Sequence, residues 1–231
     1  MKKNAKPFGF NLSPFDRRIV NSLRLSLEDI MPEIMNDHNL TERNGYGQFR
    51  WNVIIAQLRD ECRHIGWFDF GICPRGGWKT PVLFYPASHN IITFMTEDTF
   101  YSIQRRKDKA KHYLCGAASF NQNVEPEYEQ LRLELPSISS DTDEWVAKSR
   151  EQLAHAIHAS VGDIEGHILV LFDVRADKLL TVHAVRLTKN LELSTEKEDW
   201  SCYIRMPYTT NQEVDPQQCS ENDEENLVEL L

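Results

Sequence analysis

The chain has 231 residues and a formal net charge of −9, and 41% of its residues are hydrophobic. This composition is typical of a globular protein and excludes a largely disordered chain. No apolar run reaches the roughly 20 residues that a bilayer-spanning helix needs. The basic first residues are not followed by the apolar segment of a signal peptide. We therefore expect a cytoplasmic protein that does not contact a membrane.

Charge is divided unevenly along the chain. Residues 1–120 carry 17 Lys and Arg against 12 Asp and Glu, a net of +5, whereas residues 121–231 carry 9 against 23, a net of −14. A basic half joined to an acidic half indicates an anion-binding face, together with a second region that repels anions or covers that face.

Two amphipathic helices are predicted near the N-terminus. Ser13 and Pro14 are typical of a helix start, and apolar residues follow at helical spacing as far as Ile34. Pro32 lies inside this pattern and is expected to kink or end the helix. The second helix is predicted over residues 48–65.

The pattern after Gly66 changes to that of strands and shorter helices. Strands are predicted over residues 67–73, 79–85, 91–95, 168–172, 179–187 and 203–206. Helices are predicted over residues 96–106, 112–120 and 142–159. The strands of the two hairpins are expected to share one mixed or antiparallel sheet. The N-terminal helices are expected to pack on this sheet, and all helices are expected to lie on one face of it. This arrangement is an α+β fold.

Residues 10–206 are expected to form a single domain, because no linker rich in Gly, Ser or Pro divides them. A boundary near residues 121–140 is the alternative. Residues 1–9 are expected to be a flexible N-terminus, and residues 207–231 an acidic, disordered tail. The last 20 residues of this tail hold seven carboxylates and no basic residue.

The two predicted hairpins resemble each other. Val82–Thr93 aligns with Val170–Thr181 at a constant offset of 88 residues. The alignment is consistent with a duplicated strand–turn–strand unit or with two core hairpins of common composition.

Candidate site residues are the basic side chains of the first half. Aromatic residues are interleaved with them, which is typical of a surface that binds single-stranded nucleic acid. We expect these cations to gather on one exposed surface and to contact phosphates or carboxylates without reading a nucleotide sequence. They are Arg50, Arg59, Arg63, Arg75, Lys79, Arg105, Arg106, Lys107, Lys109 and Lys111.

Catalytic candidates are fewer. A metal nuclease would need carboxylates near strand ends, and Asp69, Asp173 and Asp177 are in such positions. However, the E-x-K pattern of restriction nucleases is absent from both hairpins. A metal site could alternatively form from histidines, with Asp163 or Glu165 joining them. These histidines are His155, His158 and His167.

No complete cofactor or metal motif is present. The five cysteines are widely spaced and contain no C-x-x-C pair, so neither a disulfide framework nor a thiolate zinc site is expected. Cys62 and Cys115 lie in helical apolar patterns and are predicted to be buried free thiols. We predict no cofactor and no metal.

Residues 77–114 (GWKTPVLFYPASHNIITFMTEDTFYSIQRRKDKAKHYL) resemble a bacterial family of unassigned activity that is found near prophage and mobile-element genes. The resemblance covers about a sixth of the chain. It implies a bacterial host and a link to phage or defence functions, and it carries over no catalytic residue.

The leading hypothesis is a non-enzymatic bacterial interaction protein. Its basic surface would contact nucleic acid or an acidic partner, and the acidic C-terminal region would tune that contact. The alternative is a nucleic-acid-cleaving toxin or defence effector that uses Asp69, Asp173 and the histidines. A third hypothesis is an assembly subunit, and the sequence leaves the oligomeric state open.

Overall fold

The computed structural model describes residues 13–39, 42, 44–75, 77–122, 124–127 and 140–205. The expected flexible N-terminus (1–9) and acidic tail (207–231) lie outside the described residues, and both stay predictions.

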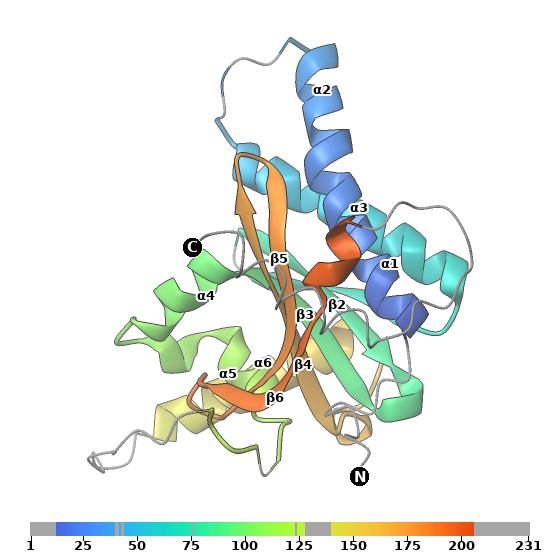
Figure 1. Ribbon diagram of the computed structural model, residues 1–231. Coiled ribbons are helices and arrows are strands. Elements are labelled where there is room, and N and C mark those ends of the chain that lie inside the picture. The colour runs from blue at the N-terminus through green and yellow to red at the C-terminus, as the bar shows by residue number, and fades with distance from the viewer. Residues whose placement is uncertain are drawn as a thin grey trace, which may run out of the picture.

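A six-stranded mixed sheet forms the centre of the molecule (Figure 1). Its strands lie side by side in chain order, and every neighbouring pair is antiparallel except β3 and β4, which are parallel. The expectation of an α+β fold with a mixed sheet is therefore confirmed. The strands are β1 (Asp69–Arg75), β2 (Trp78–Tyr85), β3 (Asn90–Thr96), β4 (Gly166–Arg175), β5 (Lys178–Leu187) and β6 (Leu193–Asp199).

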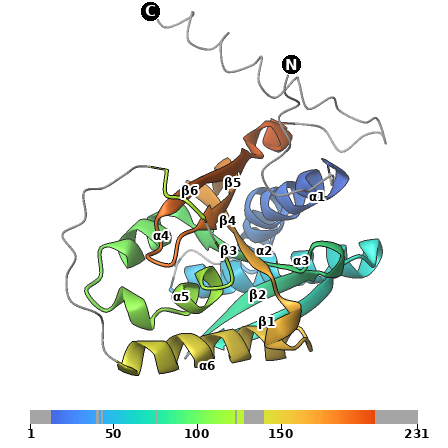
Figure 2. The same ribbon diagram turned by 90° about the horizontal axis from the view of Figure 1, so that it is seen from below.

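Helices cover both faces of this sheet, so the expectation of helices on one face is wrong. On one face lie α1 (Ser13–Arg24), the π-helix η1 (Leu25–Ile30), α2 (Met31–Asp37) and α3 (Tyr46–Ile65). The opposite face carries α4 (Glu97–Gln104), α5 (Tyr113–Ala118) and α6 (Ser140–Ala156). Figure 2 shows the sheet between these two layers. Short 3₁₀ turns are η2 (Pro86–Ser88), η3 (Lys109–Lys111), η4 (Val161–Asp163) and η5 (Ser201–Arg205).

The central strands explain this layering. Residues 91–95 and 168–172 are unbroken runs of buried side chains, which is the pattern of strands covered on both faces. Successive side chains point to opposite faces. Ile92 and Val170 therefore pack in the core beneath α1 and α3, while Ile91 and Leu171 pack in the core beneath α4, α5 and α6.

The N-terminal helix passes Pro32 without stopping. Residues 13–37 stay helical, and a π-turn at Leu25–Ile30 directly precedes the segment that holds Pro32. A π-turn places Glu28 toward the sheet, where its Oε1 accepts a hydrogen bond from the backbone N–H of Leu179 at 3.0 Å. The expected break is thus replaced by a local change of helical hydrogen bonding.

The last strand lies upstream of its predicted position. Residues 201–205 form η5, whose Tyr203 packs with Trp200 in the core beneath α1. The sixth strand is instead Leu193–Asp199, with the sequence LSTEKED. A charged edge strand resists pairing with other chains, but the same charge makes its sequence look like a loop.

The two hairpins differ in register. Val82 pairs with Thr93, so a duplicated unit with an 88-residue offset would pair Val170 with Thr181. Val170 instead pairs with Ala184, three residues further along. The register favours two core hairpins of common composition over a duplication.

Cys62 and Cys115 are free, buried thiols, as predicted, and Cys73 is buried as well. Cys202 is disulfide-bonded, which the cysteine spacing did not predict. Within the described part of the chain, no helix has the length and apolar character needed to cross a membrane.

Candidate anion-binding surface

The ten predicted cations do not form one surface. Arg50, Arg59 and Arg63 belong to α3, on one face of the sheet. Residues 105–111 follow α4 on the opposite face. The sheet and its two cores lie between the groups, so the basic half of the sequence is divided in space.

Part of the α3 group is engaged in local contacts. The Arg59 guanidinium lies over the Phe70 ring, 5.3 Å from its centroid, and Arg63 pairs with Asp60 at 3.6 Å. Arg59 and Arg63 line a cleft of about 390 Å³ together with Asp69. Arg63 lies in the last turn of α3, where a cation also stabilises the helix through its dipole. These arginines thus have structural partners.

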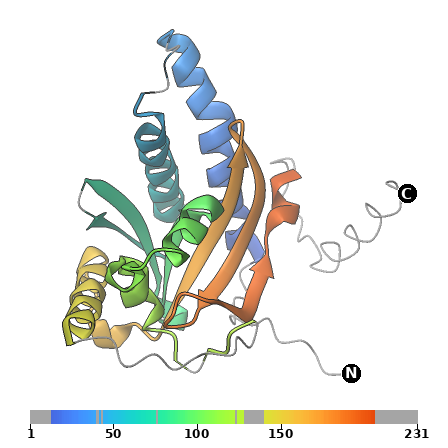
Figure 3. The same cartoon turned by 90° about the vertical axis from the view of Figure 1, so that its left-hand side faces the viewer.

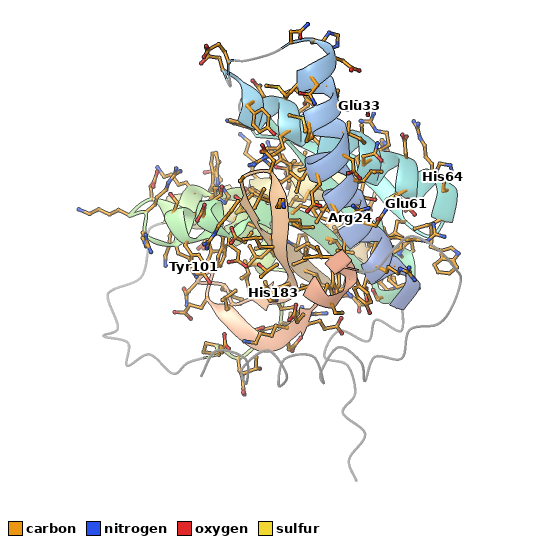
Figure 4. The ribbon with its side chains drawn as sticks, turned by 45° about the horizontal axis from the view of Figure 1, so that its top comes forward. Arg24, Glu33, Glu61, His64, Tyr101 and His183 are labelled. Carbon is orange, nitrogen blue, oxygen red and sulfur yellow. The ribbon has the colours of Figure 1, made fainter. Side chains whose placement is uncertain are left out.

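The cleft beside α3 offers no reactive thiol. Cys62 also lines it, but burial, with a smaller effect from Glu61, raises the pKa of this thiol to about 12. A thiol with such a pKa is protonated at neutral pH and is a poor nucleophile. Figure 4 places Glu61 and His64 on the N-terminal helical layer, away from Tyr101 and His183.

Two further candidates lie on the β1–β2 hairpin. Lys79 is exposed beside the half-exposed Trp78, opposite Pro74 across the hairpin. Arg75 is the last residue of β1, and its side chain lies outside the described part of the structure.

The segment after α4 meets the turn between β5 and β6. The Gln104 side chain donates a hydrogen bond to the carbonyl of Leu191 at 2.6 Å, and Lys109 donates to that of Asn190 at 3.3 Å. Lys189, which is exposed, therefore lies beside the basic segment. Helix α6 also contacts η3.

These contacts bring together three segments that are separate in the sequence, all on the α4 side of the sheet (Figure 3). Each segment carries cations. We call this group the α4–α6 basic surface: Arg105, Arg106, Lys107, Lys109, Lys111, Arg150 and Lys189. Arg105, Arg106, Lys107 and Lys111 are exposed, and Asp108 is the one acidic residue among residues 105–111. Sequence inspection missed Arg150 and Lys189 because both lie in the acidic half of the chain.

A recess opens in this surface. Its volume is about 270 Å³, and we call it the Arg150 pocket after one of the two cations that line it. The guanidinium carbon of Arg150 lies 4.5 Å from the centroid of the Phe120 ring. The Arg150 Nε is buried and has no hydrogen-bond partner among the described residues. The pocket is lined by Ser119, Phe120, Gln122, Arg150, Ile164 and Lys189.

A close helix contact holds Arg150 in place. The Cα of Gly116 on α5 approaches Ser149 on α6 so closely that a Cβ at residue 116 would overlap the Ser149 Cβ. The next residue along α6 is Arg150. The absence of a side chain at Gly116 therefore lets α6 bring Arg150 over Phe120.

A cluster of polar side chains lies at the N-terminal end of α4, the end opposite the basic segment 105–111. His183 on β5 has its Nδ1 3.4 Å from an oxygen of Asp199 on β6 and its Nε2 4.0 Å from an oxygen of Glu97 on α4. The Thr181 hydroxyl donates to the same Glu97 oxygen at 3.1 Å. Asp173 lies opposite Thr181 across the β4–β5 pair and binds Arg175. A histidine held by carboxylates is able to relay protons.

Helix α4 links this group to the α4–α6 basic surface. Glu97, Tyr101 and Arg105 are spaced by four residues and so lie along one face of the helical segment. Tyr101 is 40% exposed. Figure 4 shows Tyr101 and His183 on the same side of the molecule.

The other predicted catalytic residues do not converge. His155 and His158 are exposed at the end of α6, whereas His167 is fully buried on β4. Asp69 on β1 and Asp173 on β4 are separated by β2 and β3. Among the described residues, no group of three His, Cys, Asp or Glu side chains has a geometry that could hold a metal ion.

A family model matches residues 13–231. The chain belongs to a family of unknown function, DUF5986. The match covers the sheet, both helical layers and the α4–α6 basic surface of this family member. No curated protein and no solved structure matches the chain.

Proposed function

We propose that this DUF5986 member binds a polyanion, most simply single-stranded nucleic acid, through the α4–α6 basic surface. The observation that supports the proposal is the pair of hydrogen bonds from Gln104 and Lys109 to the β5–β6 turn. These bonds join Lys189 to a run of exposed cations on a folded surface. The exposed ring of Tyr101 supplies a face on which a base could stack.

Dependence on salt concentration tests the electrostatic part of the proposal. Each phosphate neutralised on a single strand contributes about −0.7 to the slope of log affinity against log salt concentration. Replacing Arg105, Arg106 and Lys107 by alanine should weaken binding of a labelled single-stranded oligonucleotide and reduce the slope by about 2. Fluorescence anisotropy at several salt concentrations measures both quantities.

A matched control lies on the other face of the sheet. The triple change R50A, R59A and R63A removes the same charge from α3, and it should leave affinity and slope close to those of the wild type. Equal losses from both triple variants would show that net charge alone drives binding. Replacing the seven carboxylates of residues 212–231 by the corresponding amides should strengthen binding, because the acidic tail competes with the oligonucleotide.

Cleavage of the bound strand is a second candidate function, favoured by the position of His183 between Glu97 and Asp199. In such an arrangement, a carboxylate accepts a proton from the attacking hydroxyl. The imidazole donates one to the leaving oxygen of the phosphodiester. A bacterial toxin or defence role belongs to this candidate.

Incubation of end-labelled RNA and DNA with the full chain tests cleavage directly. His183→Ala should reduce the cleavage rate about 100-fold or more while leaving binding intact. The control is His155→Ala, which alters an exposed histidine of α6. A wild type that cuts neither substrate rejects this second candidate, and equal rates in wild type and His183→Ala would assign the activity to a contaminant.

A further inference from the structure

The Arg150 pocket differs from the rest of the α4–α6 basic surface in shape. The exposed cations of residues 105–111 project into solvent, whereas Arg150 and Lys189 line a recess of about 270 Å³. A continuous strand can lie across exposed side chains, because its chain runs on in both directions from every internal phosphate. A recess instead favours a group at which the chain ends.

The Arg150 guanidinium is held in position before any ligand arrives. It stacks on Phe120 at 4.5 Å, and no carboxylate pairs with it among the residues that the structure describes. A guanidinium presents planar N–H donors that match two oxygens of a phosphate or carboxylate. Stacking reduces the side-chain entropy that binding would otherwise cost.

The other polar groups of the pocket have distinct roles. Lys189 adds a second positive charge, and the Gln122 amide is able to donate a hydrogen bond. The Ser119 hydroxyl already donates to the carbonyl of Gly116 at 2.7 Å, so it supplies no donor to an anion. Phe120 and Ile164 form the apolar part of the wall. The pocket therefore combines two cations with few competing groups.

From this geometry we infer that the Arg150 pocket binds a terminal phosphate monoester, such as the 5′-phosphate of the strand that the α4–α6 basic surface holds. The inference rests on the proposed function and deepens it. A terminal monoester carries a charge of about −1.5 to −2 at pH 7, with a second pKa near 6, whereas an internal diester carries −1. Two cations in one recess complement the dianion better than the diester.

Paired oligonucleotides of one sequence test the inference. Anisotropy is measured for the full chain with a 5′-phosphate strand and with a 5′-hydroxyl strand, and the 5′-phosphate strand should bind about tenfold more tightly at pH 7.5. This preference should shrink as the pH falls below about 6, because the monoester then takes up a proton. Inorganic phosphate should compete with the 5′-phosphate strand, and sulfate serves as the comparison anion.

Three variants separate the pocket from the surrounding surface. Arg150→Gln and Lys189→Gln should each abolish the preference. Both residues belong to the α4–α6 basic surface, so binding of the 5′-hydroxyl strand should weaken only as much as the loss of any one cation of that surface weakens it, and it should stay salt-dependent. Lys189→Gln alters an exposed residue, so it reports on the pocket even if Arg150→Gln weakens the packing on Phe120. The matched control is Lys148→Gln, an exposed position on the same helix that does not line the pocket.

The outcomes distinguish the two proposals. Equal, salt-dependent affinity for both strands would overturn the terminal-phosphate inference and leave the proposed function standing. If neither strand binds, the proposed function fails. In that case, titration calorimetry with a nucleoside 5′-monophosphate tests whether the Arg150 pocket binds a phosphate monoester. Binding by the wild type that is lost in Lys189→Gln would support the inference, and no binding by the wild type would reject it.

Discussion

At the scale of single residues, a fully buried histidine organises one end of the parallel strand pair. The Nε2 of His167 lies 2.8 Å from the Thr93 hydroxyl on β3, and its backbone N–H donates to the Asn121 side chain at 2.7 Å. Asn121 in turn donates to the carbonyl of Leu187 on β5. The sequence makes His167 a candidate metal ligand, but these bonds assign it a structural role.

The burial of His167 predicts a dependence of stability on pH. Burial, with a smaller effect from Arg186, lowers the pKa of His167 from 6.5 to about 3. The folded protein keeps this ring neutral, while the unfolded chain takes up a proton as the pH falls below 6.5. The contribution to stability is therefore complete above pH 6.5 and is lost as the pH falls toward 3, at about 1.4 kcal/mol per pH unit.

Urea unfolding at pH 7.5, 5.5 and 4.5 measures this loss. In His167→Gln, the free energy of unfolding should lack the part of its pH dependence that comes from protonation of the His167 imidazole. His155→Gln, which alters an exposed histidine, should retain it. Parallel pH profiles for the wild type and His167→Gln would show that another group is responsible.

At the scale of elements, periodicity predicted most helices and strands to within a few residues. The exceptions have physical causes. β6 was missed because its sequence is highly charged, and the edge of a sheet tolerates charge that its interior does not. The helix continues past Pro32 because a π-turn precedes it. That π-turn is fixed by a hydrogen bond between Glu28 and Leu179 of β5. A contact between residues so far apart in the chain leaves no local pattern, so the sequence around Pro32 predicts a break instead.

The contact between α5 and α6 gives a prediction about an element. In Gly116→Ala the new methyl group would overlap Ser149, so the helices must separate, and the free energy of unfolding should fall by about 1–3 kcal/mol. Binding at the Arg150 pocket should weaken as well, because Arg150 follows Ser149. Chemical denaturation and anisotropy measure the two effects.

Another glycine provides the control. Gly47 lies in α3, and apart from its chain neighbours and the backbone of its own helix, no atom lies within 4 Å of the position that a methyl group would take there. Gly47→Ala should therefore stabilise the protein slightly, by about 0.5–1 kcal/mol. If Gly116→Ala is as stable as Gly47→Ala, the close approach of α5 and α6 does not constrain the fold.

At the scale of the whole molecule, the distribution of charge in space differs from that along the chain. The basic half of the sequence contributes Arg59 and Arg63 to one face of the sheet and residues 105–111 to the other. The acidic half contributes Arg150 and Lys189 to the second group. A map of charge against residue number thus indicates an anion-binding region, but it does not identify the residues that share it.

The sequence by itself determined the local elements, because helix and strand periods, caps and turn residues act over a few positions. It also identified residues 105–111 as a dense basic segment. Only the tertiary structure decided which faces of the sheet are covered, how α3 is separated from that segment, and how Arg150, Lys189 and His183 acquire their neighbours. These features depend on contacts between residues far apart in the chain. The parallel strands β3 and β4, with helices α4, α5 and α6 between them in the sequence, bring such residues together, and no local sequence pattern predicts which residues meet.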